Sequence, residues 1–561
     1  MTRHVTQEKA GTTRLFLAVS IIVLALTLVF ITVFSYRYGW QWIDSDSASE
    51  MILGKLLAAE NTFVSGNWFY STEIRLVYQT IFTMPLFKLL GRYDNWALIR
   101  ALNILLNNLV LILSYFFMTK SMKIRTKWVL LSGIFLLMPL SVTYWDIVSF
   151  GGYYIFFIAQ FFFCLGFFVR FAFRGGDSDS GQTHNGEFSG TQKRSSWVSL
   201  IVFLLLSFAL GVQTVRSLLI IYIPLLIACV YMWHHGKRPD ALKRLLFPGF
   251  CGFAANCAGY SVNGLLHTWY SFKSYGSMRM DSLSDNFFPK LGENFAYLAG
   301  FFGFSAGTPF SSVRGLFCIA AIIGTILLFR GVYKAFRRAG AHNGAAGEIS
   351  ARQFIPVLFF VSAVFNIFIF IITNQPVEDR YLIPFMVLCF PVIAVFLEYA
   401  GKSYGNPKRA AIICGITLFI IGQGALNFQS MVTRDINTVR KGYIQYLVDN
   451  KLDYGFATYW NANVTTELSN GRIEMAGLES RIRSGANANQ FRILPLLIPK
   501  KYLDPLYHRG EAFLLLSSDE WDLVKGRSSF SGRRPDYKDD NFVLFRYPSA
   551  QIIHRDVLAA F

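Results

Sequence analysis

The chain has 561 residues, of which 53% are hydrophobic and only 16% are charged, whereas soluble domains carry about 25% charged residues. This composition excludes an ordinary soluble enzyme and predicts a polytopic α-helical membrane protein, because the apolar residues come in blocks of roughly 17 to 25, the length of a membrane-spanning helix. The formal net charge of +19 does not indicate a nucleic-acid partner, since most basic residues fall in short loops between these blocks, as in cytoplasmic loops.

The first apolar block, 15–33, follows a basic N-terminus that we expect to stay in the cytoplasm. The next segment, 36–95, is then a long extracytoplasmic loop. It opens with Trp40 and Trp42, which we expect to anchor at the lipid headgroups. An acidic cluster beginning at Asp44 follows directly, at the membrane surface.

The remaining apolar blocks bring the prediction to about eleven spanning helices. One long block is interrupted by a charge that must face water or a partner, so we expect a tight outer turn there and count the block as two spans. A re-entrant piece could precede the eighth span, at 295–309. The blocks after the first are 96–118, 129–144, 153–171, 197–233 (two spans), 246–266, the block after 309, 354–373, 382–397 and 411–426.

Basic loops alternate with acidic or neutral loops along these spans, which is the pattern that sets orientation. The alternation places six acidic residues on the outer side: Asp44, Asp46, Glu73, Asp146, Glu378 and Asp379. It also places the polar segment 429–561 outside. Short β-type runs and one set of apolar residues at helical spacing predict a small α/β domain there. We therefore divide the chain into a membrane domain, 1–428, which includes the loop 36–95, and an extracytoplasmic domain, 429–561.

Two interpretations of the acidic cluster are open. It could be a solvated loop just beyond a helix end. Alternatively, Asp44 or Asp46 could be a general base at the interface, where a hydroxyl must lose its proton as a bond to a membrane-bound donor forms. The same two carboxylates could also hold a divalent cation through oxygen ligands.

Arginines provide the second group of candidates. The segment Glu378-Asp379-Arg380-Tyr381 is either a loop with internal salt bridges or a phosphate clamp, because the guanidinium fork matches phosphate oxygens. Arg216 interrupts the 197–233 block and is either a snorkelling helix end or a second cation for a lipid phosphate. Glu73 and Arg75 could be a simple surface pair.

These pieces resemble the GT-C superfamily of integral-membrane glycosyltransferases. The resemblance covers the predicted membrane domain and rests on an acidic motif after the first helix, Asp44-Ser45-Asp46, and on the later part of the same loop, 65–86. It also rests on Glu378-Asp379-Arg380-Tyr381-Leu382-Ile383-Pro384, which is similar to the segment that opens a late helix in protein mannosyltransferase-like (glycosyltransferase family 39-like) members. The acidic pair common in the family, Asp-Glu, is here Asp-Ser-Asp, so the identity of the base stays open.

The resemblance implies a transferase of a bacterial cytoplasmic membrane that takes a sugar from a polyprenyl phosphate, on the outer face, to a cell-envelope glycan, lipid or protein. Asp44 or Asp46 would deprotonate the acceptor, and the donor phosphate would be held by Arg380, Tyr381, Arg216 and Arg75. Acceptor-binding or auxiliary roles would fall to Glu73, Glu378, Asp379 and Asp146.

Two other functions are open alternatives. A polysaccharide polymerase or ligase also uses lipid-linked substrates. A lipid or sugar transporter would be no enzyme at all, but transporters often carry broken helices paired across two halves, and the sequence shows no such symmetry.

Overall fold

The structure is a computed structural model that describes residues 2–558 except 73, 75, 174–189, 237–241, 274–278, 281–282, 342–349, 402–406, 480–490 and 531. The chain forms two compact units. The first unit is Met1–Ile31, Leu105–Gly264 and Gly276–Met431, and the second is Thr32–Ile104, Leu265–Tyr275 and Val432–Phe561. This division differs from the boundary predicted after residue 428, because the whole predicted outer loop, 36–95, groups with the C-terminal segment.

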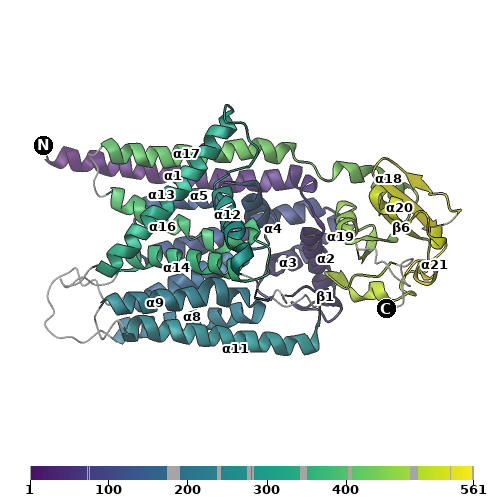
Figure 1. Ribbon diagram of the computed structural model, residues 1–561, viewed down its shortest axis with the longest axis horizontal. Helices are drawn as coiled ribbons and strands as arrows, with labels where there is room; N and C mark the ends of the chain where they lie inside the picture. Colours follow the sequence, from purple (N-terminus) through teal and green to yellow (C-terminus); the bar gives the residue numbers. More distant parts are fainter. Residues whose placement is uncertain are drawn as a thin grey trace. The chain divides into compact units, whose positions relative to one another are not determined.

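Long apolar helices confirm the polytopic fold (Figure 1). Among the described residues, nine helical segments are long and apolar enough to cross a membrane, or ten if one bent pair counts as a span. A shorter apolar helix at Trp197–Gln213, within α8 (Gly190–Gln213), covers a further predicted span. The nine segments fall on α1 (Thr2–Tyr38), α4 (Trp96–Ser121), α7 (Ile155–Ala172), α9 (Ile223–Gly236), α11 (Phe247–Trp269), α13 (Val313–Ala341), α14 (Ala351–Ile372), α15 (Asp379–Met386) with α16 (Cys389–Gly401), and α17 (Pro407–Thr433).

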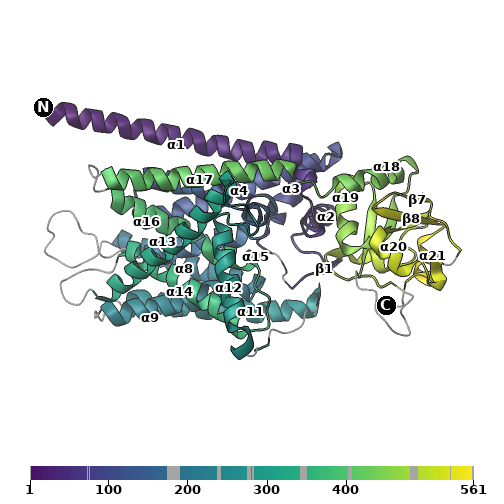
Figure 2. The same cartoon turned by 45° about the horizontal axis from the view of Figure 1, so that its top comes forward.

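Several helices of the first unit lie side by side (Figure 2). Helix α14 packs against both α9 and α13, and α7 packs against α8. Glycines allow α8 and α11 to approach backbone to backbone. A Cβ on Gly211 would lie 2.1 Å from the carbonyl oxygen of Asn256, and one on Gly259 would lie 2.1 Å from that of Phe208. Small residues at helix contacts are typical of membrane bundles, where van der Waals packing drives association.

The third predicted span is not the straight helix expected over 129–144. Helix α5 (Thr126–Leu137) ends at Met138, whose ψ of 139° is extended, and a second piece, 142–150, follows at an angle of 98°. Proline at position 139 explains the break, because it disfavours helical geometry at the preceding residue. The second piece consists of α6 (Val142–Tyr144) and a π-helical turn, Trp145–Phe150, a form that is frequent at functional sites.

The predicted interruption of the fifth apolar block is confirmed. Helix α8 ends at Gln213, and a π-helical turn, Leu218–Tyr222, leads into α9. The Thr214 hydroxyl accepts the backbone N–H of Arg216 at 3.1 Å. The break thus gives local partners to backbone groups that a continuous helix would otherwise satisfy.

The second unit carries a five-stranded mixed sheet in the order β4-β3-β6-β8-β7. Strand β3 pairs in parallel with β4 and β6, and β8 pairs antiparallel with β6 and β7. A smaller sheet joins β1, β2 and β5 in the order β2-β1-β5. The strands are β1 (Trp68–Tyr70), β2 (Ser271–Phe272), β3 (Tyr454–Thr458), β4 (Glu474–Leu478), β5 (Ile498–Pro499), β6 (Ala512–Ser517), β7 (Tyr537–Lys538) and β8 (Phe542–Tyr547).

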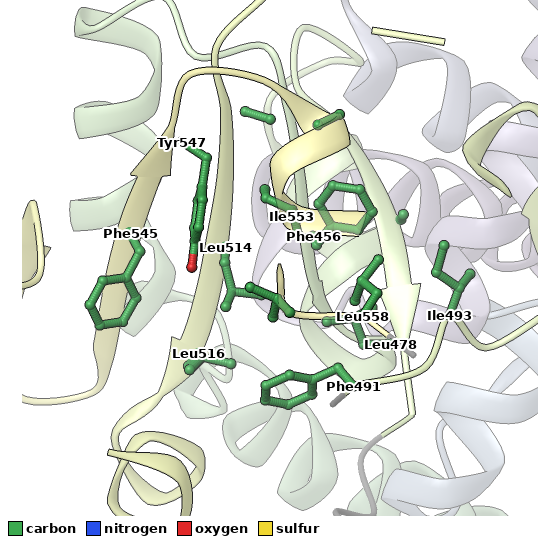
Figure 3. Close-up of a cluster of buried hydrophobic side chains, with 14 of the residues drawn as sticks. Phe456, Leu478, Phe491, Ile493, Leu514, Leu516, Phe545, Tyr547, Ile553 and Leu558 are labelled. Atoms are coloured by element: carbon green, nitrogen blue, oxygen red, sulfur yellow. The ribbon is translucent and has the colours of Figure 1, made fainter. Parts of the chain in front are cut away.

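Both faces of the larger sheet are buried, which confirms the predicted α/β domain. One face packs its side chains against α20 (Ser518–Val524) and α21 (Ala550–Asp556), as Figure 3 shows for Phe456, Leu514, Phe545 and Ile553. The other face carries alternate residues of the same strands and is covered by α18 (Lys441–Asp449) and α19 (Tyr459–Leu468). Burial on both faces explains the unbroken apolar runs in β6 and β8.

The predicted orientation leads to a labelling experiment. In a variant background whose native cysteines are unreactive, we expect a membrane-impermeant thiol reagent to label Asp519→Cys from outside intact cells and to miss Arg338→Cys. Both side chains are exposed, so burial does not limit the reaction. Labelling of both positions from the same side would contradict the orientation.

Candidate active site

Asp44 begins the first helix after the first membrane span. It is the N-cap of α2 (Ser45–Glu60) and accepts the backbone N–H of Ser47 on Oδ1 at 2.7 Å. The Ser47 hydroxyl in turn accepts the N–H of Asp44 at 3.1 Å, which completes a capping box. An Asp at this position satisfies a backbone donor that the helix itself leaves without a partner. The local geometry therefore explains why the helix starts here, and it fixes the orientation of the Asp44 carboxylate.

Asp46 lies in the first turn of the same helix and is half-buried. Its Oδ1 accepts a hydrogen bond from the hydroxyl of Tyr459, the first residue of α19. The backbone carbonyl of Tyr459 accepts the hydroxyl of Ser45. Residues more than 400 positions apart in sequence thus meet within the second unit, and the C-terminal segment supplies a direct partner of the predicted catalytic pair.

A buried ion pair fixes α19 beside this turn. Arg100 donates to Glu467 through Nε at 2.6 Å and through Nη2 at 2.5 Å, and the same Nη2 donates to the backbone carbonyl of Ser47 at 3.0 Å. The side chains of Arg100 and Glu467 are only 5% and 2% exposed. The pKa of the Glu467 carboxyl is raised, chiefly by burial. The Arg100 guanidinium lowers this pKa, and the nearby Asp44 carboxylate raises it further. The Glu467 carboxylate is therefore close enough to Asp44 for their charges to interact.

The two tryptophans before the acidic cluster, Trp40 and Trp42, were both expected to anchor in the lipid headgroups, and their environments in the structure differ. The Trp42 side chain is only 2% exposed, and the Arg434 guanidinium lies 4.5 Å from its ring centroid. Trp40 has the Lys441 ammonium 3.6 Å above its ring. The anchoring prediction is thus wrong for Trp42, whose ring is buried and packs against protein.

The predicted phosphate-binding arginines that the structure describes lie around one tyrosine in the first unit. The guanidinium carbons of Arg380 and Arg216 lie 5.1 Å and 5.8 Å from the ring centroid of Tyr381, and that of Arg216 lies 4.9 Å from the ring of Tyr154. Arg380 also forms an ion pair with Glu378. Two guanidinium groups thus lie beside the same aromatic ring at the start of α15, and the Glu378 carboxylate is paired with one of them.

Of the residues predicted to bind the acceptor or to assist, Asp379 and Asp146 lie in the first unit. Asp379 accepts the Thr143 hydroxyl at 2.6 Å on Oδ2 and the backbone N–H of Arg380 at 2.8 Å on Oδ1. This joins the start of α15 to the bent third span, in which Asp146 occupies the π-helical turn. Glu73 and Arg75 lie outside the described residues. The carboxylate pair belongs to the second unit and the arginine pair to the first.

Each carboxylate of the pair has one oxygen in a hydrogen bond. One oxygen of Asp44 caps α2, and one oxygen of Asp46 accepts the Tyr459 hydroxyl. Within the described ranges, no group of three or more His, Cys, Asp or Glu side chains is placed to hold a metal ion.

Three residues of this site were not predicted from the sequence: Tyr459, Arg100 and Glu467. Arg100 carried a usable signal, since a charge inside a predicted apolar helix requires a partner. Tyr459 and Glu467 carried none, because their importance comes from a contact across most of the chain. Together these residues define the candidate site as a carboxylate pair at the start of α2 that is supported by α19.

Among known proteins, similarity to this chain is found in structure and not in sequence families. No protein-family model and no curated protein matches its sequence. Among solved structures it is similar to ArnT from Cupriavidus metallidurans bound to undecaprenyl phosphate, with 14% identity over 96% of this chain and 98% of that one and a TM-score of 0.49.

The chain is also similar to the Archaeoglobus fulgidus oligosaccharyltransferase in a complex with zinc and sulfate, with 11% identity over 88% of this chain and 68% of that one and a TM-score of 0.48. The oligosaccharyltransferase AglB from the same organism, bound to an inhibitory peptide and a dolichol-phosphate, gives 12% identity, coverages of 89% and 69%, and a TM-score of 0.45. These proteins belong to the GT-C class that the sequence resembles.

Proposed function

We propose that the protein is a membrane glycosyltransferase that moves a sugar from a polyprenyl-phosphate donor to an acceptor hydroxyl at the outer face of a bacterial cytoplasmic membrane. The acceptor is a cell-envelope glycan, lipid or protein. The observation that carries the proposal is the carboxylate pair Asp44 and Asp46, held in the first turn of α2 directly after a membrane span. The resemblance of this motif and of the segment 378–384 to GT-C enzymes supports the same class.

In the proposed reaction, Asp44 takes the proton of the acceptor hydroxyl while the acceptor oxygen bonds to the anomeric carbon of the sugar. The bond between that carbon and the phosphate oxygen breaks, and polyprenyl phosphate leaves as the anion. Asp46 orients the acceptor. A positioned general base raises the rate of such a reaction by about 10²–10⁴-fold. The acceptor hydroxyl would reach Asp44 at the membrane interface, where the lipid donor is also present.

The arginine pair is suited to the donor. Arg380, assisted by Arg216 and Tyr381, would bind the phosphate and offset the charge that develops as it leaves. Arg75 is retained as a further candidate for the phosphate, and Glu73, Glu378, Asp379 and Asp146 as acceptor or auxiliary residues. The ion pair between Arg380 and Glu378 would have to open or share the guanidinium when the phosphate binds.

The direct test is sugar transfer by the purified protein in lipid nanodiscs, with a panel of synthetic polyprenyl-phosphate sugars and an extract of cell-envelope glycans and lipids as acceptor. We expect release of polyprenyl phosphate that depends on the acceptor. Movement of intact donor lipid across liposomes, with no cleavage of any donor in the panel, would refute the proposal and favour a transporter.

Loss of the Arg380 guanidinium should weaken donor binding. We expect Arg380→Ala to reduce affinity for the polyprenyl-phosphate sugar by roughly tenfold or more, because a charge-assisted contact to phosphate is lost. Arg380→Lys should restore only part of it, since lysine keeps the charge but lacks the fork. Affinity is measured by titration of the donor into detergent-solubilised protein.

The matched control is Arg314→Ala, which removes an exposed arginine of the same unit that bonds to Ser430. We expect its donor affinity to match that of the wild type. Equal affinities for the wild type, Arg380→Ala and Arg380→Lys would place the phosphate elsewhere.

A further inference from the structure

The first turn of α2 is held by a residue of the C-terminal segment at two points. The Tyr459 hydroxyl donates to Asp46, and the Tyr459 carbonyl accepts from Ser45. Tyr459 itself is only 5% exposed, so its ring has little freedom to turn the hydroxyl away. The side chain of Asp46 is therefore fixed from outside its own helix.

Three further contacts hold α19 against α4 and α2. The Arg100–Glu467 ion pair joins α19 to α4, and Arg100 also bonds to the Ser47 carbonyl. An apolar cluster of Ile43, Ala48, Val464 and Leu468 fills the space between the two helices. The side-chain oxygen of Asn470, just after α19, accepts the N–H of Trp96 at the start of α4, at 3.0 Å. These contacts fix the position of α19, and with it the position of Tyr459 beside Asp46.

We infer that Tyr459 is a positioning residue of the transferase site, whose hydroxyl holds the Asp46 carboxylate in a fixed orientation toward the acceptor. This deepens the proposed function and rests on it, because the role of Asp46 is part of that proposal. A hydroxyl that donates to a carboxylate favours the charged form over the protonated form. The segment 429–561 would then complete the reaction centre, in addition to any binding of the acceptor glycan.

The experiment measures the protonation of Asp46 directly and without substrate. The purified protein in detergent is treated with a carbodiimide and an amine across a pH series, and modification of Asp46 is quantified by mass spectrometry. Because the protonated carboxyl is the form that reacts, the pH at half-maximal labelling reports its titration. We expect Tyr459→Phe to move this midpoint upward by about one pH unit.

The matched control is Tyr443→Phe. This substitution also removes a buried hydroxyl in contact with α19, since the Tyr443 hydroxyl lies 2.7 Å from Thr465 Oγ1, but it leaves Asp46 untouched. We expect the midpoint of Asp46 in this variant to match the wild type. Coincident midpoints for the wild type and Tyr459→Phe, or an equal shift in both variants, would overturn the inference.

Transfer assays separate this inference from the proposed function. If the wild type transfers sugar, we expect Tyr459→Phe to lower turnover and to shift the acidic limb of its pH profile upward, with donor affinity unchanged. An active wild type whose pH profile superimposes on that of Tyr459→Phe would refute the positioning role alone. An inactive wild type with the expected labelling shift would refute the transferase and leave the Tyr459–Asp46 contact established.

Discussion

Asp44→Asn is expected to lower sugar-transfer turnover by about 10²–10⁴-fold while the protein keeps its stability and its affinity for the donor. The physical reason is that asparagine is as good an N-cap as aspartate. Its side-chain oxygen can still accept the N–H of Ser47, as Asp44 does at 2.7 Å. It cannot take a proton from the acceptor hydroxyl, so only the chemical role is removed.

Two companion variants make this result interpretable. Asp44→Ala removes the cap as well as the base, so it should lose the activity and also about 1 kcal/mol of stability. Asp540→Asn neutralises an exposed carboxylate of the C-terminal segment and should behave as the wild type. The measurements are initial rates with a synthetic lipid-phosphate donor and thermal denaturation of each variant.

The roles of the two aspartates are separated by the same assay on Asp46→Asn. If Asp46 orients the acceptor, its loss should raise the acceptor concentration needed for half-maximal rate, whereas loss of Asp44 should act on the maximal rate. Reversed patterns would exchange the roles. Full activity in both single variants would show that the carboxylate pair takes no part in the reaction and would favour the transporter alternative.

The membrane helices could be predicted from the sequence because their signal is local. Length and hydropathy identify a span without knowledge of its neighbours, and the interruption near Arg216 followed from a charge in an apolar block. The bend after α5 was not predicted, because the apolar block 129–144 reads as one continuous span. Pro139, which follows Met138, was the sequence signal for it. Breaks of this kind depend on backbone geometry, which composition does not report.

The site could be predicted only in part, for the opposite reason. Asp44 and Asp46 were found because they follow the first span directly. Their supporting partners come from α19 and α4, and nothing in the local sequence of Tyr459 or Glu467 distinguishes them from other residues of an α/β domain. Arg100 is the exception, because a buried charge in a spanning helix implies a partner, although the sequence could not identify that partner as Glu467.

Removal of the Glu467 carboxylate should destabilise the second unit strongly. Glu467→Ala leaves the Arg100 guanidinium buried without its counter-ion, and breaking a buried pair by removing one partner costs about 3–5 kcal/mol. For a unit of this size that corresponds to a fall in apparent Tm on the order of 10 °C. We expect this fall in detergent-solubilised protein, followed by tryptophan fluorescence.

Two variants test whether the effect comes from the uncompensated charge. The double substitution Arg100→Met with Glu467→Leu removes both charges and should recover most of the lost Tm, because apolar residues often replace a buried ion pair at little cost. Glu511→Ala breaks the exposed pair with Arg546, whose side chains are 54% and 32% exposed, and should change the Tm little, since exposed pairs contribute little. A Glu467→Ala protein that melts with the wild type would show that the pair does not hold α19, and with it Tyr459, beside the carboxylates of α2.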